Sequence, residues 1–192
     1  MQTLTSLPDN LPMPLDDGAC ANLSGTNLPA VDLIATNGVT VNLAAIKGWL
    51  VVYCYPMTGQ PDKPLPAGWD EIAGARGCTP QSCTFRDHYQ ALQQLNAQVF
   101  GLSVQSTNYQ QEVVDRLHLP YALLSDAHYK FTDVLNLPTF EVDKMRLIKR
   151  VTLIAFNGVI QHCFYPVFPP DKNAEAVINW LKLHAWFCKR DC

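Results

Sequence analysis

The segment Trp49-Leu50-Val51-Val52-Tyr53-Cys54-Tyr55 is a continuous run of apolar and aromatic residues. Such a run is typical of a strand that lies in the middle of a sheet and is buried on both faces. We therefore interpret residues 49–55 as the central strand of the fold. The segments on either side are interpreted relative to this strand.

Further strand-like segments occur before and after this run. Two of them flank Asn37-Gly38 and two flank Asn157-Gly158, and this dipeptide between apolar segments predicts a hairpin with a two-residue turn. Together with two single segments, the additional expected strands are residues 31–36, 39–43, 99–104, 121–124, 150–156 and 159–164.

Helical segments lie between these strands. Thr79 followed by Pro80 predicts the start of one helix. Thr107 with Gln110 forms a capping box that predicts the start of another, which ends at Pro120. The other expected helices are residues 128–135 and the amphipathic segment 171–184.

This order of elements predicts an α/β fold with one central mixed sheet and helices on both of its faces. The hairpin at residues 31–43 is an N-terminal extension of that sheet. Residues 1–24 are rich in proline and are expected to form an extended arm, while residues 25–192 form the single domain. A long loop rich in proline and glycine, at about residues 59–76, interrupts the domain after the central strand.

The overall composition excludes several classes of protein. With 48% apolar and 16% charged residues, the chain of 192 residues can bury a sizeable core, and its net charge of -3 provides no basic field for nucleic acid. The longest apolar run, residues 49–57, is far shorter than the roughly 20 residues that span a membrane. Residues 1–6 do not fit a signal peptide. We expect a soluble, cytoplasmic protein without nucleic-acid or membrane partners.

Of the seven cysteines, Cys78 has the position that most favours reactivity. It lies where the long loop meets the helix that is expected to begin near Thr79. Unpaired backbone amides and the positive end of the helix dipole favour the thiolate at such a place. The alternative interpretation is a free surface thiol at the end of a loop.

Cys83 follows Cys78 by five residues. In an α-helix, that separation places the two Cα atoms roughly 8.5 Å apart, beyond the ~7 Å limit for a disulfide. A bond between them therefore requires the first helical turn to unwind. The alternative is that Cys83 is a small apolar residue of the core.

The other cysteines have less specific interpretations. Cys54 and Cys163 lie in expected strands and are interpreted as inert core residues, and Cys20 in the arm would be reactive only through exposure. Cys188 and Cys192 could pair or bind a metal, but a frayed terminus explains them better. The spacing of the cysteines does not favour zinc, and no metal or other cofactor is expected.

The segment from Gly77 to Asp87, with the sequence GCTPQSCTFRD, closely resembles the active-site helix of the peroxiredoxin Q group. This group is also called the bacterioferritin comigratory proteins and belongs to the AhpC/TSA peroxiredoxin family. The resemblance covers about residues 25–184, including Arg150-Val151-Thr152-Leu153-Ile154, which resembles a family strand that begins with arginine. The segment with the two cysteines is specific, whereas the rest alone indicates only a thioredoxin-like fold.

The resemblance implies a mechanism that uses no metal, haem or flavin. It implies that Cys78 is the peroxidatic cysteine, whose thiolate attacks the peroxide and becomes a sulfenic acid. Cys83 would be the resolving cysteine, which forms an intramolecular disulfide with Cys78 that thioredoxin or a similar dithiol reduces. The second thiol protects the sulfenic acid from irreversible oxidation. Arg150 corresponds to the arginine that holds the thiolate and polarises the peroxide.

The chain departs from the family pattern at one position. The family has a threonine three residues before the peroxidatic cysteine, where this chain has Ala75. The segment Tyr55-Pro56-Met57-Thr58-Gly59 resembles the family's proline and threonine, separated from Cys78 by the loop at about 59–76. If this loop bulges outward, Thr58 can still place its hydroxyl beside the thiolate.

The sequence as a whole predicts a thiol peroxidase that reduces hydrogen peroxide and organic hydroperoxides and acts as a monomer or weak homodimer. The alternatives are a thiol–disulfide oxidoreductase, which the absence of a Cys-x-x-Cys pair disfavours, and a peroxide sensor that passes oxidation to a partner protein. The inserted loop either shapes access to Cys78 or is a tolerated surface decoration.

Overall fold

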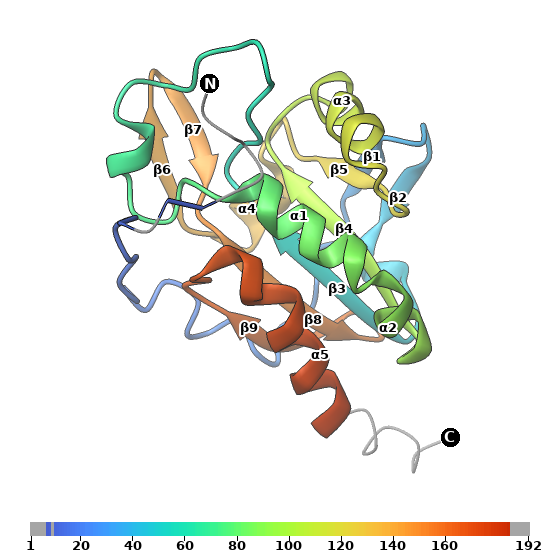
Figure 1. Cartoon of the computed structure of the whole chain (residues 1–192). Coiled ribbons are helices and arrows are strands. Elements are labelled where there is room, and N and C mark those ends of the chain that lie inside the picture. Colours follow the sequence, from blue (N-terminus) through green and yellow to red (C-terminus); the bar gives the residue numbers. More distant parts are fainter. Residues whose placement is uncertain (1–6, 9, 185–192) are drawn as a thin grey trace.

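The structure is a computed structural model in which residues 7–8 and 10–184 are described. Its centre is a seven-stranded mixed sheet with the strand order β2-β1-β5-β4-β3-β8-β9 (Figure 1). The strands of this sheet are β1 (Asp32–Ala35), β2 (Thr40–Asn42), β3 (Trp49–Cys54), β4 (Ala97–Ser103), β5 (Leu123–Ser125), β8 (Val151–Phe156) and β9 (Val159–Phe164). A separate two-stranded sheet consists of β6 (Thr139–Val142) and β7 (Met145–Ile148).

The central strand is β3, as the apolar run predicts. All six of its residues are buried, and it pairs in parallel with β4 and antiparallel with β8. Its first residue, Trp49, lies opposite Ala97 on one side and Phe156 on the other. A strand with neighbours on both sides and layers above and below must be apolar at every position, which explains why its sequence does not alternate.

One face of the sheet is covered by four helices, which lie in front of it in Figure 1. They are α1 (Cys78–Asp87), α2 (Tyr89–Gln94), α3 (Thr107–Leu117) and α5 (Asn173–His184). The chain passes from β3 to β4 and then to β5 in the same direction across the sheet, so right-handed crossovers place α1, α2 and α3 on the same face. Phe85, Leu92, Val113 and Leu181 fill the core below them.

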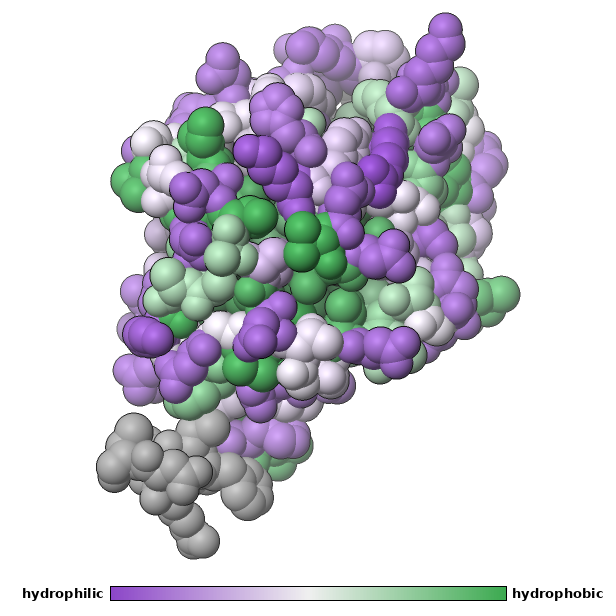
Figure 2. All heavy atoms as spheres, turned by 180° about the vertical axis from the view of Figure 1, so that it is seen from behind, coloured by the Kyte–Doolittle hydropathy of each residue, from purple (hydrophilic) through white to green (hydrophobic). Residues whose placement is uncertain are grey.

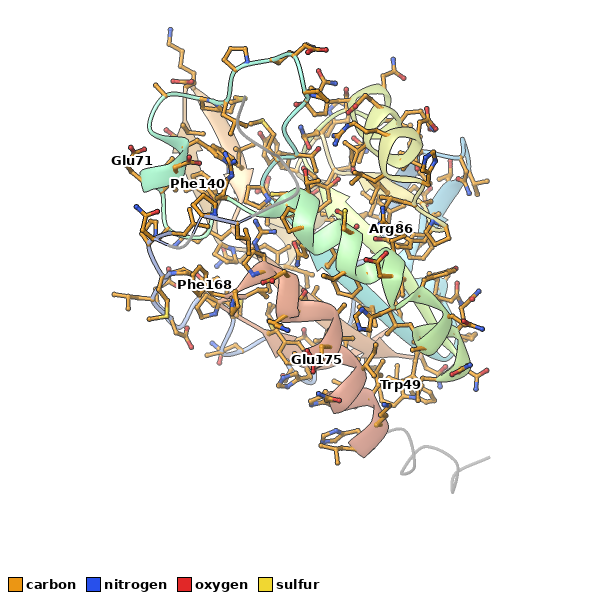
Figure 3. All side chains as sticks on the ribbon, viewed as in Figure 1. Trp49, Glu71, Arg86, Phe140, Phe168 and Glu175 are labelled. Carbon is orange, nitrogen blue, oxygen red and sulfur yellow. The ribbon has the colours of Figure 1, made fainter. Side chains whose placement is uncertain are left out.

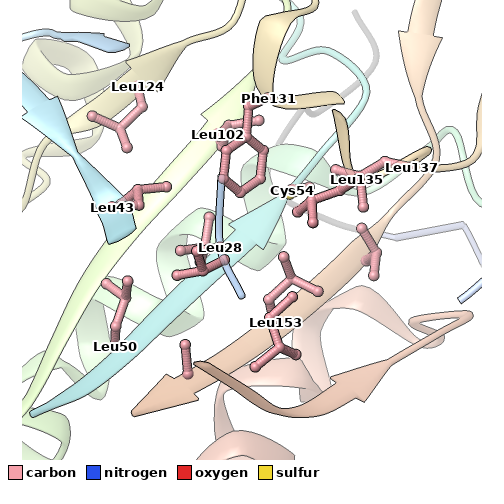
Figure 4. Close-up of a cluster of buried hydrophobic side chains, with 14 of the residues drawn as sticks. Leu28, Leu43, Leu50, Cys54, Leu102, Leu124, Phe131, Leu135, Leu137 and Leu153 are labelled. Atoms are coloured by element: carbon pink, nitrogen blue, oxygen red, sulfur yellow. The ribbon is translucent and has the colours of Figure 1, made fainter. Parts of the chain in front are cut away.

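The opposite face is covered by α4 (Lys130–Val134) and by the segment that leads into β1. Phe131 of α4 packs in one cluster with Leu28, Leu43 and Leu102 (Figure 4). Figure 2 views the molecule from this side and shows a small apolar area surrounded by hydrophilic side chains. The sheet therefore has helices on both faces, which confirms the predicted fold class.

The N-caps of two helices differ from the sequence-based expectation, by two residues in α1 and by one residue in α3. The first helix begins at Cys78 with Gly77 as its N-cap, so Thr79 is already inside the first turn and does not cap it. The third helix is capped by Ser106, whose hydroxyl accepts from the Tyr109 amide, rather than by Thr107. A glycine cap leaves no side-chain signature, and at Ser106-Thr107 two neighbouring residues are both suitable caps.

The inserted loop and the sheet of β6 and β7 form a third, smaller cluster. Trp69 in a short 3-10 turn (Trp69–Glu71) packs with Ala75, Leu147 and Phe140, and the rings of Trp69 and Phe140 are 6.1 Å apart. Figure 3 shows Phe140 beside the turn that carries Glu71. The loop is therefore attached to the domain by apolar packing of its own.

The described part of the N-terminal arm lies against the domain at several points. Asp17 accepts hydrogen bonds from Lys149 Nζ at 2.7 Å and from the Tyr165 hydroxyl at 2.8 Å. Directly after the arm, the amide of Gly25 donates to the carbonyl of Ile160 at 2.7 Å, so the segment that follows the arm is bonded to β9. Within the described residues, no helix is long and apolar enough to span a membrane.

Candidate active site

Cys78 is the first residue of α1 and is only 3% exposed. Gly77 before it has a φ of +105°, which a residue with a side chain rarely adopts. A Cβ atom at Gly77 would also lie 2.3 Å from Pro170 Cγ and 2.9 Å from Leu7 Cδ2. Both the backbone conformation and the packing therefore require glycine there, and this turn places the Cys78 sulfur at the helix N-terminus.

The arginine that the resemblance indicates lies in contact with this sulfur. Arg150 is 3% exposed, and its Nη2 donates to Cys78 Sγ at 3.3 Å, although the two residues are 72 positions apart. The same nitrogen donates to the carbonyls of Ala75 at 3.3 Å and Arg76 at 3.1 Å. Arg150 therefore holds the backbone that precedes Cys78 as well as the sulfur itself.

No carboxylate among the described residues neutralises the charge of Arg150. No Asp or Glu oxygen in the described residues lies within salt-bridge distance of it, and its Nη1 donates to the neutral Gln81 Oε1 instead. Its Nε is buried without a hydrogen-bond partner among those residues. A buried cation without a counter-ion is costly. A thiolate at Cys78 would supply the missing negative charge.

Cys83 lies in the same helix and is half-buried. Burial raises the pKa of its thiol, and the nearby positive charge of Arg86 opposes this only in part. In the helical state, the separation of five residues along the helix keeps the Cys83 thiol out of bonding distance of Cys78. The structure therefore describes the reduced state, with both thiols free.

Several buried hydrogen bonds hold the segment between the two cysteines in its helical form. The Gln81 Nε2 donates to Asn173 Oδ1 at 2.9 Å, and the Tyr121 hydroxyl donates to the Ser82 carbonyl at 3.0 Å. The Tyr53 hydroxyl donates to Ser82 Oγ at 3.2 Å. Unwinding of this segment breaks these hydrogen bonds. They therefore contribute to the free energy that the unwinding requires.

The segment that contains Thr58 lies beside Cys78, because Met57 and Gly59 line the same small pocket as the cysteine. The Thr58 hydroxyl, however, donates to Gln105 Oε1 at 3.2 Å. The described structure has no hydrogen bond between Thr58 and Cys78. The catalytic role of Thr58 therefore stays a prediction.

The pocket beside Cys78 has a volume of about 10 Å³, which is space for a single water-sized molecule. Leu65 and Trp69 of the inserted loop form part of its wall, together with Arg76. The loop therefore contributes apolar side chains directly to the approach to the sulfur. This observation favours the interpretation in which the insertion shapes access.

The remaining cysteines are placed as follows. Cys54 is fully buried and burial raises the pKa of its thiol, which fits the expected core role, whereas Cys163 is only partly buried. Cys20 was expected to be reactive only if it is exposed. It is 7% exposed, so this condition is not met. Cys188 and Cys192 lie outside the described residues. No group of three or more potential metal ligands occurs within the described part of the chain.

The positioning residues Gln81, Asn173 and Thr152 were not recognised from the sequence. Gln81 joins Arg150 to Asn173, and the Thr152 hydroxyl donates to Asn173 Oδ1 at 2.7 Å. Asn173 is 92 positions from Gln81, and bonds between such distant segments leave no local pattern. The only signal was the place of Gln81 between the two cysteines.

Comparisons with known proteins agree with this geometry. The chloroplastic peroxiredoxin Q of Gentiana triflora is 27% identical over 190 residues, which are 95% of this chain and 79% of the relative. The crystal structure of peroxidoxin BcpB from Mycobacterium tuberculosis has a TM-score of 0.69 at 20% identity and covers 84% of this chain and 97% of its own. That of the Xanthomonas campestris bacterioferritin comigratory protein has a TM-score of 0.66 at 19% identity and covers 92% and 99%.

These likenesses confirm the predicted thioredoxin-like fold and the resemblance to peroxiredoxin Q proteins. The model of the Redoxin family matches residues 23–178, which include both cysteines of α1 and Arg150. This match covers most of the chain, which therefore belongs to the Redoxin family.

Proposed function

We propose that the chain is a thiol peroxidase that reduces hydrogen peroxide and organic hydroperoxides, with Cys78 as its nucleophile. The observation that carries this proposal is the contact of Arg150 with the Cys78 sulfur, since this buried cation has no carboxylate partner among the described residues. Support for organic substrates comes from the Xanthomonas campestris structure, which is described in terms of alkyl peroxide reduction.

In the first step, the Cys78 thiolate attacks one oxygen of the peroxide. An S–O bond forms, the O–O bond breaks, and the leaving oxygen takes a proton to become water or an alcohol. Arg150 is placed to stabilise the thiolate and the charge that develops on the departing oxygen. Cys78 is then a sulfenic acid.

In the second step, the Cys83 sulfur attacks the Cys78 sulfenic sulfur and expels water. An S–S bond replaces the S–O bond, and the disulfide protects Cys78 from further oxidation. This step requires α1 to unwind between the two cysteines, because the helical state keeps them apart. A dithiol such as thioredoxin then reduces the disulfide by two thiol–disulfide exchanges and is itself oxidised.

The cellular setting is part of the proposal. Action as a monomer or weak homodimer in the cytoplasm stays a prediction, and the plant relatives are named as chloroplast proteins. Membership of the Redoxin family agrees with a thiol reductant in general terms.

The experiment that tests the proposal follows NADPH oxidation coupled to thioredoxin reductase, thioredoxin and peroxide. Wild type should turn over, Cys78→Ser should be inactive, and Cys83→Ser should lose recycling while keeping the first, single-turnover reaction with peroxide. Cys163→Ser is the matched control, because this thiol packs in the cluster on the opposite face of the sheet, and it should retain wild-type turnover.

Two outcomes would contradict the proposal. Full turnover in Cys78→Ser would place the nucleophile elsewhere. A Cys78–Cys83 disulfide that forms on addition of peroxide but is not reduced by any dithiol tested would favour a peroxide sensor over an enzyme with turnover.

A further inference from the structure

A second pair of cysteines lies on the other face of the sheet. Cys20 comes from the N-terminal arm and Cys163 from β9. The chain before Cys20 bonds to Tyr165 and the chain after it bonds to Ile160, and these two positions flank Cys163. Cys163 packs against the core cluster that contains Cys20 and Cys54. Cys78 belongs to the cluster on the opposite face, so the pair takes no part in the site described above.

The backbone on both sides of Cys20 is held in place. Before it, Asp17 accepts hydrogen bonds from Lys149 and Tyr165, and after it, Gly25 donates to the carbonyl of Ile160 in β9. The backbone of Cys163 is equally fixed, because β9 pairs with β8. A disulfide needs its two Cβ atoms about 3.5–4.5 Å apart. Because the chain is anchored on both sides of Cys163 and both thiols belong to one cluster, we expect them to reach this distance with little movement.

We propose that Cys20 and Cys163 form a second intramolecular disulfide, which cross-links the arm to β9 when the protein is exposed to a hydroperoxide or a disulfide oxidant. With hydrogen peroxide, one sulfur attacks the O–O bond and becomes a sulfenic acid as water leaves. The other sulfur attacks the sulfenic sulfur and a second water leaves, so two thiols and one peroxide yield one disulfide and two waters. This step does not depend on the proposed peroxidase reaction.

The surroundings select this pair over the third thiol of the cluster. Cys54 is fully buried in β3, whereas Cys163 is only partly buried, so an oxidant in solution reaches the pair at Cys163 and not at Cys54. The pKa of Cys163 is raised, first by the neighbouring Cys20 thiol and then by burial. The thiolate of Cys163 is therefore scarce at neutral pH, and the rate of cross-linking should increase as pH rises.

The cross-link would act on a pocket next to Arg150. This pocket has a volume of about 380 Å³, and the arm contributes one wall of it through Met13, Pro14 and Leu15, while Arg150 lies in another wall. A bond between Cys20 and Cys163 fixes the arm a few residues from that wall. Oxidation at one face of the sheet thereby controls how firmly the arm covers the region beside the reactive arginine.

The test uses the full chain with Cys78, Cys83, Cys188 and Cys192 replaced by serine, so that no peroxidase chemistry contributes and only three thiols remain. The protein is oxidised with diamide and, separately, with hydrogen peroxide, and digested without reduction. Mass spectrometry should find the peptides of Cys20 and Cys163 linked, with the loss of two hydrogen atoms and full reversal by dithiothreitol. The midpoint of thermal unfolding should rise by roughly 5–10 °C on oxidation and fall back on reduction.

The control carries Cys20→Ser in the same background and should show neither the cross-link nor the shift in unfolding temperature. Cross-links to Cys54, or no cross-link with either oxidant in protein that is folded by circular dichroism, would overturn the proposal. If the serine variant does not fold, the same peptide map of the oxidised wild-type chain decides the question. A Cys20–Cys163 link in a chain without peroxidase turnover would support this inference and contradict only the proposed function.

Discussion

The Arg150 guanidinium group makes three kinds of contact at the same time, which no other side chain can combine. It donates to the Cys78 sulfur, it donates to backbone carbonyls of the residues before Cys78, and through Gln81 it is linked to α1. A lysine would keep the charge, but its single ammonium group cannot reproduce the planar fork of donors. The geometry of the guanidinium group, and not only its charge, therefore positions the reactive thiol.

We expect Arg150→Lys to lower the second-order rate constant for the reaction of reduced protein with hydrogen peroxide by about 10²-fold or more, the size of effect seen when one preorganised donor is removed. Stopped-flow measurement under single-turnover conditions checks this. The control is Arg146→Lys, whose side chain is 40% exposed and pairs with Asp133, and which should react like wild type. A rate for Arg150→Lys within twofold of wild type would exclude this role.

At the level of single residues, the sequence indicates the reactive groups better than their supports. Cys78 could be recognised because a helix start leaves a local pattern, and Arg150 because the resemblance includes the strand that it begins. The bond between Gln81 and Asn173 joins segments that only the folded chain brings together. Thr58 shows the same limit, since its position beside the site was predicted only for a loop that bulges outward, and its partner Gln105 was not predicted.

In the proposed reaction, the helix α1 takes part in two states. In the helical state, it presents Cys78 at its N-terminus, and in the disulfide state its first turns must open so that Cys83 can reach Cys78. The Tyr121 hydroxyl, which donates to the Ser82 carbonyl, holds the part of the helix that must move. The ring of this tyrosine also packs against Tyr53, so removal of the hydroxyl alone leaves the packing in place.

We expect Tyr121→Phe to lower the free energy of unfolding by about 1 kcal/mol and to increase the rate of Cys78–Cys83 disulfide formation by up to about fivefold. Rapid-quench mass spectrometry after one equivalent of peroxide measures this rate. Tyr129→Phe is the matched control, because the Tyr129 hydroxyl donates to the Arg146 carbonyl at 2.9 Å, away from α1. It should lose similar stability with no change in the rate. Equal or slower disulfide formation in Tyr121→Phe would show that this bond does not limit the opening.

The inserted loop acts as one element, because its apolar side chains pack together and face the pocket beside Cys78. We expect Leu65→Ala, and more strongly Trp69→Ala, to raise the ratio of the rate constants for cumene hydroperoxide and hydrogen peroxide severalfold, since each change enlarges a pocket that holds only one water-sized molecule. Single-turnover kinetics with both peroxides checks this. An unchanged ratio in folded Leu65→Ala would indicate a loop without influence on selectivity.

Among the elements, the strands of the seven-stranded sheet were predicted and the two strands of the small sheet were not. Residues 49–54 and 151–164 carry long apolar runs or an Asn-Gly turn, and both signals are local. The strands β6 and β7 have four residues each, and their turn uses Asp143 and Lys144 at φ of +48° and +63° instead of glycine. Their stability comes from packing against the insertion, which no local pattern shows.

At the scale of the whole molecule, the arm joins the N-terminal end of the chain to the region of the site. Asp17 is the polar anchor of this attachment, because hydrogen bonds from Lys149 and then Tyr165 lower its pKa from 3.8 to about 2. A carboxyl group whose pKa is lower in the folded state stabilises that state above its ordinary pKa. The contribution is lost as pH falls through the folded value, and it is modest because both charges are partly exposed.

We therefore expect the attachment of the arm to be constant from neutral pH down to about 4 and to weaken between pH 3.8 and about 2. Hydrogen exchange of residues 10–24, corrected for the intrinsic pH dependence, measures it. Asp17→Asn should show weaker protection at neutral pH and no further loss specific to the arm on acidification. Identical pH profiles for wild type and Asp17→Asn would show that this carboxylate does not hold the arm.

The pairing of the segment after the arm with β9 also has a consequence for biosynthesis. Asn27 forms a bridge with Val159, which lies 132 positions later, so the early segment has no partner while the chain grows. At about 5–20 residues per second, a ribosome needs roughly 7–26 s to translate that interval. During this time, the nascent chain exposes apolar residues such as Leu23 and Leu28, which pack in the finished core. This segment is thus among the last of the domain to be held in place, and co-translational chaperones would find a target there.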